Sequence, residues 1–435
     1  MPKSVHSTIM LRPMRTPAFR RLFFGESIAA FADQMLLVAL TLLALRMAGP
    51  GFALGSVLAV AAVPGALLMP LGGWVSDRFS PALVLLLCGA GRTLLAVGLA
   101  SIALLQVTDL WPLYALAGVL GVLNAIYYPA SFSTVPAVLK DKTLLGAGNG
   151  LVMGTQQVSE MAGPVLAASV VALFGLASVF GANALMFAAA AVSFALVASG
   201  TRRATVTNPD REAPSGEFAW RGRGELAGSE KSLGAPLGPV GGTLEGVRYV
   251  WRDPLLRTML FALALLSFST SGPLRVGGAA LAQTRLGGAE AFGVLLSAFG
   301  AGLLIGLLVA GSLVRTGRRG RDFILGTAAL GLGMGSLGFA SILILAAALA
   351  AGMGVSAGYL GVLLMAWLQE RSEPSLHGRV MSLVMFAAVA VDPLSYALMG
   401  ILSELDLRVM FVAAGSLLVI AAMLAAASHT VRGLQ

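Results

Sequence analysis

The chain has 435 residues, of which 57% are hydrophobic and only 11% are charged. Soluble domains carry about 25% charged residues, so the composition excludes an ordinary soluble protein and favours one that faces lipid, where charge is costly. The net charge is +9, and the single cysteine, Cys88, excludes an internal disulfide and a multi-cysteine metal site.

Twelve long apolar stretches follow one another along the chain, and each can cross the ~30 Å hydrocarbon core as a helix. The first six cover residues 22–46, 54–75, 81–105, 111–138, 145–173 and 177–199. The second six cover 258–284, 290–314, 323–340, 342–368, 379–403 and 408–428, with no charge between the ninth and the tenth. We therefore predict an all-α membrane protein with two pseudo-symmetric six-helix bundles, residues 1–200 and 258–435.

The polar segment 201–257 separates the two halves and is rich in Gly, Pro and charges of both signs. Such a segment cannot bury enough apolar surface to fold alone, so we expect a partly flexible linker. Its last part, residues 243–257, can form an amphipathic helix on the membrane surface, because its apolar residues share one face.

The basic residues fall mostly on one side of the predicted membrane. Of the 29 Lys and Arg residues, 24 lie in segments that share a side with the termini. The positive-inside rule then places both termini and the segment 201–257 in the cytoplasm. Because this bias explains the basic charge, we expect no nucleic-acid partner.

Ionisable residues inside the apolar stretches are the sharpest functional signal, because hydrocarbon makes them costly to keep. They serve either as structural ion pairs and polar contacts, or as acids shielded from lipid that take up and release a proton. We select three proton-coupling candidates, Asp33, Glu160 and Asp392, and two charge partners, Arg92 and Arg275. Arg275 alternatively attracts an anionic substrate group.

A further acid, Glu26, follows soon after the start of the first apolar stretch at Leu22. We expect its side chain to reach the membrane interface, as long polar side chains near helix ends do.

The stretch LGGWVSDRFS places Gly73 four residues before the pair Asp77 and Arg78. It resembles the cytoplasmic loop motif of the major facilitator superfamily, although Phe79–Ala82 departs from the Gly and basic residue that follow there. The resemblance implies that Asp77 helps to latch the two halves together on the cytoplasmic side. Its partner would be the start of the eleventh stretch with Arg379, where free N–H groups favour an anion. The alternative is a solvated charge pair in a loop.

Three further segments resemble the branch of that superfamily that contains bacterial effector-secretion and macrolide or siderophore exporters. They are FRRLFFGESIAAFADQMLLVAL, YYPASFSTVPAVLKDKTLLGAGNGLVMGTQQVSEMAGPVLAA and LLMAWLQERSEPSLHGRVMSL. Gly163 and Pro164 are a reduced form of the Gly-Pro pattern of antiporters, or simply a helix kink. The resemblance also implies a central cavity lined by the first, fourth, seventh and tenth stretches. Its candidates, which can equally pack between helices, are Asn124, Tyr127, Tyr128 and Tyr359.

We therefore expect an exporter of a small amphipathic organic molecule that works by proton antiport and alternating access. It would be a monomer in the lipid bilayer of the bacterial cytoplasmic membrane, without a cofactor or metal. A lipid or lysophospholipid flippase, an importer and a non-transporting sensor remain alternatives. An enzyme is disfavoured, because the fingerprint-like GMGSLG at 333–338 lies inside an apolar stretch without a preceding strand.

Overall fold

The computed structural model describes residues 11–139, 141–206, 248, 251–313, 319–371 and 377–427. Eleven helical spans in this part are long and apolar enough to cross a membrane. Residues 207–247 and 249–250 lie outside the described part, and with them most of the linker and of the surface helix expected at 243–257.

The first six predicted stretches are all helices. They are α2 (Pro17–Ala48), α3 (Phe52–Arg78), α4 (Pro81–Leu104), α5 (Trp111–Val138), α6 (Leu145–Phe174) and α7 (Leu176–Val206). Two 3₁₀ turns, η1 (Arg12–Arg15) and η2 (Lys142–Leu144), precede α2 and α6. Pro17 and Pro81 each open a helix, where the missing N–H costs nothing. Gly49 and Gly175 end α2 and α6 with positive φ, a conformation that favours glycine.

The second half contains the other six spans. The seventh consists of α10 (Pro254–Gly272), η3 (Pro273–Gly277), α11 (Gly278–Leu281) and η4 (Ala282–Leu286). The others are α12 (Ala289–Leu313), α13 (Arg319–Leu337), α14 (Leu343–Arg371), the pair α15 (His377–Ala390) and α16 (Asp392–Leu405), and α17 (Leu407–Ala427). Helix α13 is the span outside the eleven apolar ones, because its first turn carries Arg319, Arg321 and Asp322.

Two spans of the second half are irregular in ways that the apolar pattern does not predict. The seventh contains two π-helical turns, η3 and η4, and the first of them begins at Pro273. The eleventh is interrupted at Val391, directly before Asp392 and Pro393. Proline lacks the N–H that a continuous helix needs and clashes with the carbonyl four residues before it, so a local irregularity is expected at both places.

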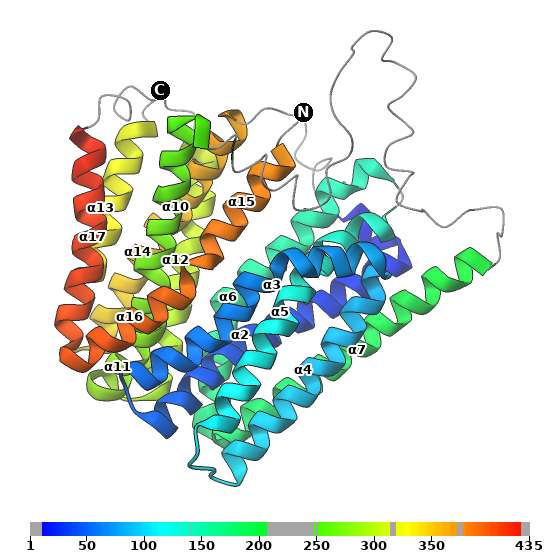
Figure 1. Cartoon of the computed structure of the whole chain (residues 1–435), viewed down its shortest axis with the longest axis horizontal. Coiled ribbons are helices and arrows are strands. Elements are labelled where there is room, and N and C mark those ends of the chain that lie inside the picture. Colours follow the sequence, from blue (N-terminus) through cyan, green and yellow to red (C-terminus); the bar gives the residue numbers. More distant parts are fainter. Residues whose placement is uncertain are drawn as a thin grey trace.

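Figure 1 shows the two bundles, with α2–α7 on one side and α10–α17 on the other. The start of α2 and the end of α17 lie toward the same end of the molecule, the top of Figure 1, which we call the terminal side. Within each bundle, glycines let helices approach closely. A Cβ on Gly302 of α12 would lie 2.0 Å from the carbonyl oxygen of Ala351, and one on Gly354 of α14 equally close to that of Phe299.

The bundles contact each other through α3 with α16 and α6 with α12. The Phe52 N–H at the start of α3 donates to Glu404 Oε1 at 2.8 Å. The backbone of Gly55 meets that of Tyr396, and the Val165 N–H of α6 donates to Ser297 Oγ of α12 at 3.0 Å. These contacts between the bundles lie in the half of the membrane between the middle of the spans and the side opposite the termini.

Candidate functional site

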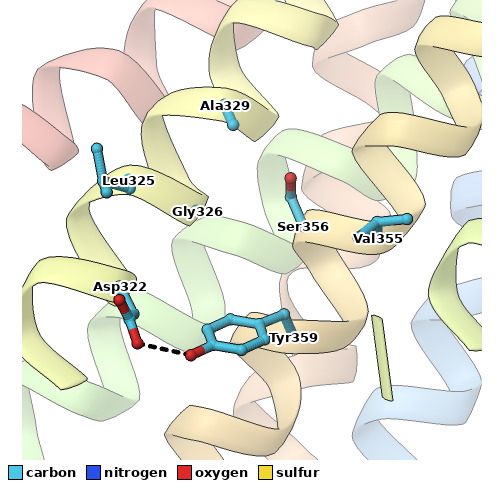
Figure 2. A pocket seen from close by; sticks show the side chains of 7 residues that line it. All are labelled: Asp322, Leu325, Gly326, Ala329, Val355, Ser356 and Tyr359. Carbon is cyan, nitrogen blue, oxygen red and sulfur yellow. Dashed lines mark hydrogen bonds between the residues drawn. The ribbon is translucent and has the colours of Figure 1, made fainter. Parts of the chain in front are cut away.

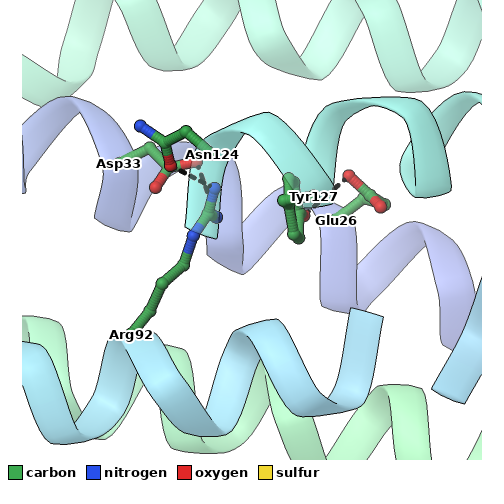
Figure 3. A network of polar contacts seen from close by, with 5 residues as sticks. All are labelled: Glu26, Asp33, Arg92, Asn124 and Tyr127. Atoms are coloured by element: carbon green, nitrogen blue, oxygen red, sulfur yellow. Dashed lines mark hydrogen bonds and ion pairs between the residues drawn. The ribbon is translucent and has the colours of Figure 1, made fainter. Parts of the chain in front are cut away.

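The polar centre of the N-terminal bundle forms around Arg92 of α4, whose side chain is 0% exposed. Its Nη1 lies 3.1 Å from Asp33 Oδ2, and its Nη2 donates to Asn124 Oδ1 at 2.7 Å (Figure 3). The guanidinium lies over the ring of Tyr127, 3.8 Å from its centroid. The structure therefore brings together four residues that the sequence singled out, and Asn124 and Tyr127 hold the arginine in place.

Glu26 joins the same network, and the expectation that it reaches the interface is wrong. The residue is 4% exposed, and Tyr127 Oη donates to its Oε2 at 3.0 Å (Figure 3). The reason is that α2 begins at Pro17, before the apolar stretch, so Glu26 lies about nine residues, or ~14 Å, along the helix. The helix-opening proline was the signal that could have placed it correctly.

A second polar group lies where the two bundles meet. Arg275 is in the π turn η3, and its guanidinium lies 6.0 Å from the ring centroid of Tyr396. It interacts electrostatically with Asp392, the first residue of α16, and with Glu160 of α6. In the described part of the chain no carboxylate lies within 4 Å of Arg275. The Glu160 carboxylate accepts a long hydrogen bond from Gln157 Nε2 at 3.5 Å.

Tyr128 connects the two groups. It lies within electrostatic range of Asp33 and Arg92 of the first group and of Arg275 and Glu160 of the second, and it is 37% exposed. The two groups together, here called the intramembrane charge site, contain four acids and two bases: Glu26, Asp33, Arg92, Glu160, Arg275 and Asp392.

The Gly73–Arg78 motif lies on the last turns of α3 and not in a loop. Arg78 is exposed at the helix end, where the helix dipole favours a cation. The side chains of Asp77 and Arg379 lie outside the described part, so the latch between them stays a prediction. A Cβ on Gly73 would meet no atom within 4 Å.

Gly163 and Pro164 lie inside α6, which continues through both residues. A Cβ on Gly163 would come 2.6 Å from Gln34 Cβ of α2, so this glycine permits close packing within the bundle. Pro164 has no N–H to offer to the carbonyl of Glu160 four residues earlier. Gly300 of α12 approaches that same carbonyl.

Tyr359 lies apart from the charge site. Its hydroxyl donates to Asp322 Oδ2 at 2.7 Å, in a pocket between α13 and α14.

Comparisons with known proteins agree with this architecture. The chain is 27% identical to the enterobactin exporter EntS of Shigella boydii over 88% of its own length and 85% of that protein. It is 25% identical to an uncharacterised MFS-type transporter, y4rN, of Sinorhizobium fredii over 94% of both chains. Among solved structures, a POT family transporter bound to 5-aminolevulinic acid matches 93% of this chain with a TM-score of 0.70 at 12% identity. The nucleoside transporter NupG matches 94% of this chain with the same TM-score and identity.

The profile of the Major Facilitator Superfamily matches residues 22–287, which include the first bundle except the start of α2, and the seventh span. The twelve spans in two bundles and the likeness to solved transporters agree with that match. The chain is a member of the major facilitator superfamily and has its fold.

Proposed function

We propose that this protein exports a small amphipathic organic compound across the bacterial cytoplasmic membrane in exchange for protons. The single observation that carries the proposal is the intramembrane charge site, in which four acids outnumber two bases. Desolvation penalises the charged form of a buried carboxyl. A site with more acids than bases therefore has carboxyls that can carry a proton through the membrane.

The acids differ in how well they are suited to this role. The Asp33 charge is neutralised by Arg92 at 3.1 Å. Glu26, Glu160 and Asp392 have no cation within ion-pair distance in the part of the chain that the structure describes. We assign the exchangeable proton to this second set, and we assign to the Asp33–Arg92 pair the task of holding α2, α4 and α5 together.

The contacts between the bundles support transport by alternating access. They join the middle of the spans to the side opposite the termini, through α3–α16 and α6–α12. With the termini in the cytoplasm, as the distribution of basic residues predicts, this conformation is closed toward the outside. Export then requires these contacts to separate while contacts form on the terminal side.

The resemblance to a siderophore exporter supports the direction and the class of substrate. EntS is named as an enterobactin exporter. In this chain Arg275 and the rings of Tyr128 and Tyr396 would meet an anionic or aromatic part of such a compound.

The experiment is transport by the full chain in proteoliposomes, measured with a panel of amphipathic compounds with and without an imposed pH gradient. We expect uphill transport only with the gradient and counterflow without it. Both variants Glu160→Gln and Asp33→Asn should impair uphill transport. Glu160→Gln should leave counterflow intact, whereas Asp33→Asn, which breaks a structural ion pair, should impair counterflow as well. If both transport uphill at the rate of the wild type, proton coupling through this site is wrong.

A further inference from the structure

A pocket of about 410 Å³ lies between α13 and α14, away from the charge site. Figure 2 shows Asp322 and Tyr359 facing each other at one end of the pocket. The Tyr359 hydroxyl donates to Asp322 Oδ2 at 2.7 Å. The rest of the lining consists of Leu325, Gly326, Ala329 and Val355, together with Ser356, whose hydroxyl donates to the Gly352 carbonyl of its own helix. The pocket therefore has one charged end, and the remainder of its lining is mostly apolar.

The pocket opens on the flank of the C-terminal bundle. Helix α13 packs on α14 and α17 of its own bundle, and Figure 1 shows it on the side away from α2–α7. Leu325, which lines the pocket, is 54% exposed. In a membrane this opening meets lipid and not the interface between the bundles.

The lining of the pocket on α13 changes from charged to apolar with increasing depth in the membrane. Asp322 lies in the first turn of α13, at the terminal side. Leu325 and Ala329 follow one and two turns deeper, and Ala329 lies ~10 Å beyond Asp322 along the helix. This order, charge at the membrane surface and apolar side chains below it, is the order of a lipid head group and its acyl chains.

The charges at the polar end complement a zwitterionic head group. In the described part of the chain Asp322 has no cation within ion-pair distance, because its neighbour Arg319 pairs with Glu370. Tyr359 bonds one of its carboxylate oxygens, which leaves the other free to accept. Arg321, the residue before Asp322, is exposed at the start of α13, beside the pocket and outside its lining. A carboxylate beside an exposed guanidinium can bind an ammonium and a phosphate that lie next to each other.

We propose that this pocket is a binding site for a membrane lipid with a primary-ammonium head group, of the phosphatidylethanolamine class. The ammonium donates to Asp322, the phosphate lies against Arg321, and an acyl chain follows Leu325 and Ala329. A phosphatidylcholine head group has the same charges, but its quaternary ammonium has no N–H to donate. The site should therefore distinguish these two lipids.

The test titrates the purified full chain with short-chain phosphatidylethanolamine, phosphatidylcholine and phosphatidylglycerol, and counts bound lipid by native mass spectrometry. We expect phosphatidylethanolamine to bind about tenfold more tightly than phosphatidylcholine, the typical effect of a hydrogen bond to a charged group. Equal binding of these two lipids to the wild-type chain would overturn the proposal. Stronger binding of phosphatidylglycerol would also overturn it.

Two variants locate the site. Asp322→Asn should abolish the preference for phosphatidylethanolamine. Ala329→Leu places a larger side chain in the pocket at an exposed position, and it should weaken the binding of both zwitterionic lipids. Asp109→Asn changes an exposed acid in the loop between α4 and α5 and should leave the preference intact. A preference that survives both pocket variants places the lipid elsewhere and contradicts the proposal.

Dodecylammonium, a simple cationic amphiphile, distinguishes a lipid-binding site from a transport site. Uphill transport of that amine, lost in Asp322→Asn, would contradict a lipid site.

Discussion

The hydroxyl of Tyr127 donates to Glu26 Oε2 at 3.0 Å, and the ring of the same Tyr127 lies 3.8 Å from the Arg92 guanidinium. One tyrosine thus connects Glu26, a buried acid that has no ion-pair partner among the described residues, to the ion pair of Arg92 with Asp33. A change of charge on Glu26 acts on three helices at once, α2, α4 and α5. This is the kind of connection that couples protonation to movement of helices.

Glu26→Gln is expected to uncouple transport from the proton gradient. Glutamine keeps the size of the side chain and an oxygen that accepts from Tyr127, but it cannot carry a proton. Uphill transport in proteoliposomes should fall at least ~100-fold, the lower end of effects for a lost proton-transfer group, while counterflow stays near the wild-type rate. Glu290→Gln, which changes an exposed acid in the first turn of α12, is the control and should leave both rates unchanged. Uphill transport by Glu26→Gln at the control's rate would remove Glu26 from the mechanism.

Arg92→Met is expected to destabilise the protein, because it leaves the half-buried Asp33 among the helices without its fully buried partner. Removing one member of a buried pair typically costs about 3–5 kcal/mol, whereas replacing both members is far less harmful. The double variant with Asp33→Asn should therefore recover most of the lost stability. Cys88, the single cysteine, is 3% exposed and reports unfolding through its reaction with a maleimide dye during heating. A double variant no more stable than Arg92→Met alone would contradict a structural ion pair.

The helices could be predicted well from the sequence, because a span needs only a long apolar run and its ends show as charges, Pro or Gly. The form of the irregular places could not, although Pro273 and Pro393 mark their positions. The π turn at Pro273 and the break before Asp392 depend on how the freed carbonyl groups are accommodated by neighbouring helices. The apolar run also starts later than the helix at α2, because the first turns carry Arg20 and Arg21.

The sequence predicted which charged residues belong to the candidate site, but it did not predict which residues contact one another. Intramembrane charge alone identified Asp33, Arg92, Glu160, Arg275 and Asp392, because each is costly in hydrocarbon. It could not show that Asn124 and Tyr127 bind Arg92, or that Tyr359 bonds Asp322 on the bundle's flank, since these contacts join helices far apart in the sequence. The depth of Glu26 was predicted wrongly, because α2 begins at Pro17, before the apolar stretch starts.

Gly300→Val is expected to shift the protein toward the state in which the bundles separate on the side opposite the termini. A Cβ on Gly300 would lie 2.8 Å from the Glu160 carbonyl oxygen and equally close to Met161 Cα, and neither backbone atom can yield without moving α6. The measurement is maleimide labelling of Ser297→Cys, introduced in a Cys88→Ser background, from that side of the membrane. We expect the labelling rate to rise about tenfold, which corresponds to about 1.4 kcal/mol. In Gly352→Val, where a Cβ would meet nothing within 4 Å, the rate should not change.

Glu404 is expected to hold the same side closed through its hydrogen bond with the Phe52 N–H, at 2.8 Å. That N–H lies in the first turn of α3 and has no acceptor within its own helix, so the carboxylate satisfies a donor of the other bundle. Glu404→Ala removes the acceptor, and Glu404→Gln keeps one. Labelling of Ser297→Cys should therefore be about two- to tenfold faster in the alanine variant, the range expected for one lost hydrogen bond, and near the wild-type rate in the glutamine variant. Equally raised rates in both variants would mean that the charge of Glu404, and not its bond to α3, matters for closure, and wild-type rates in both would mean that Glu404 does not hold this side closed.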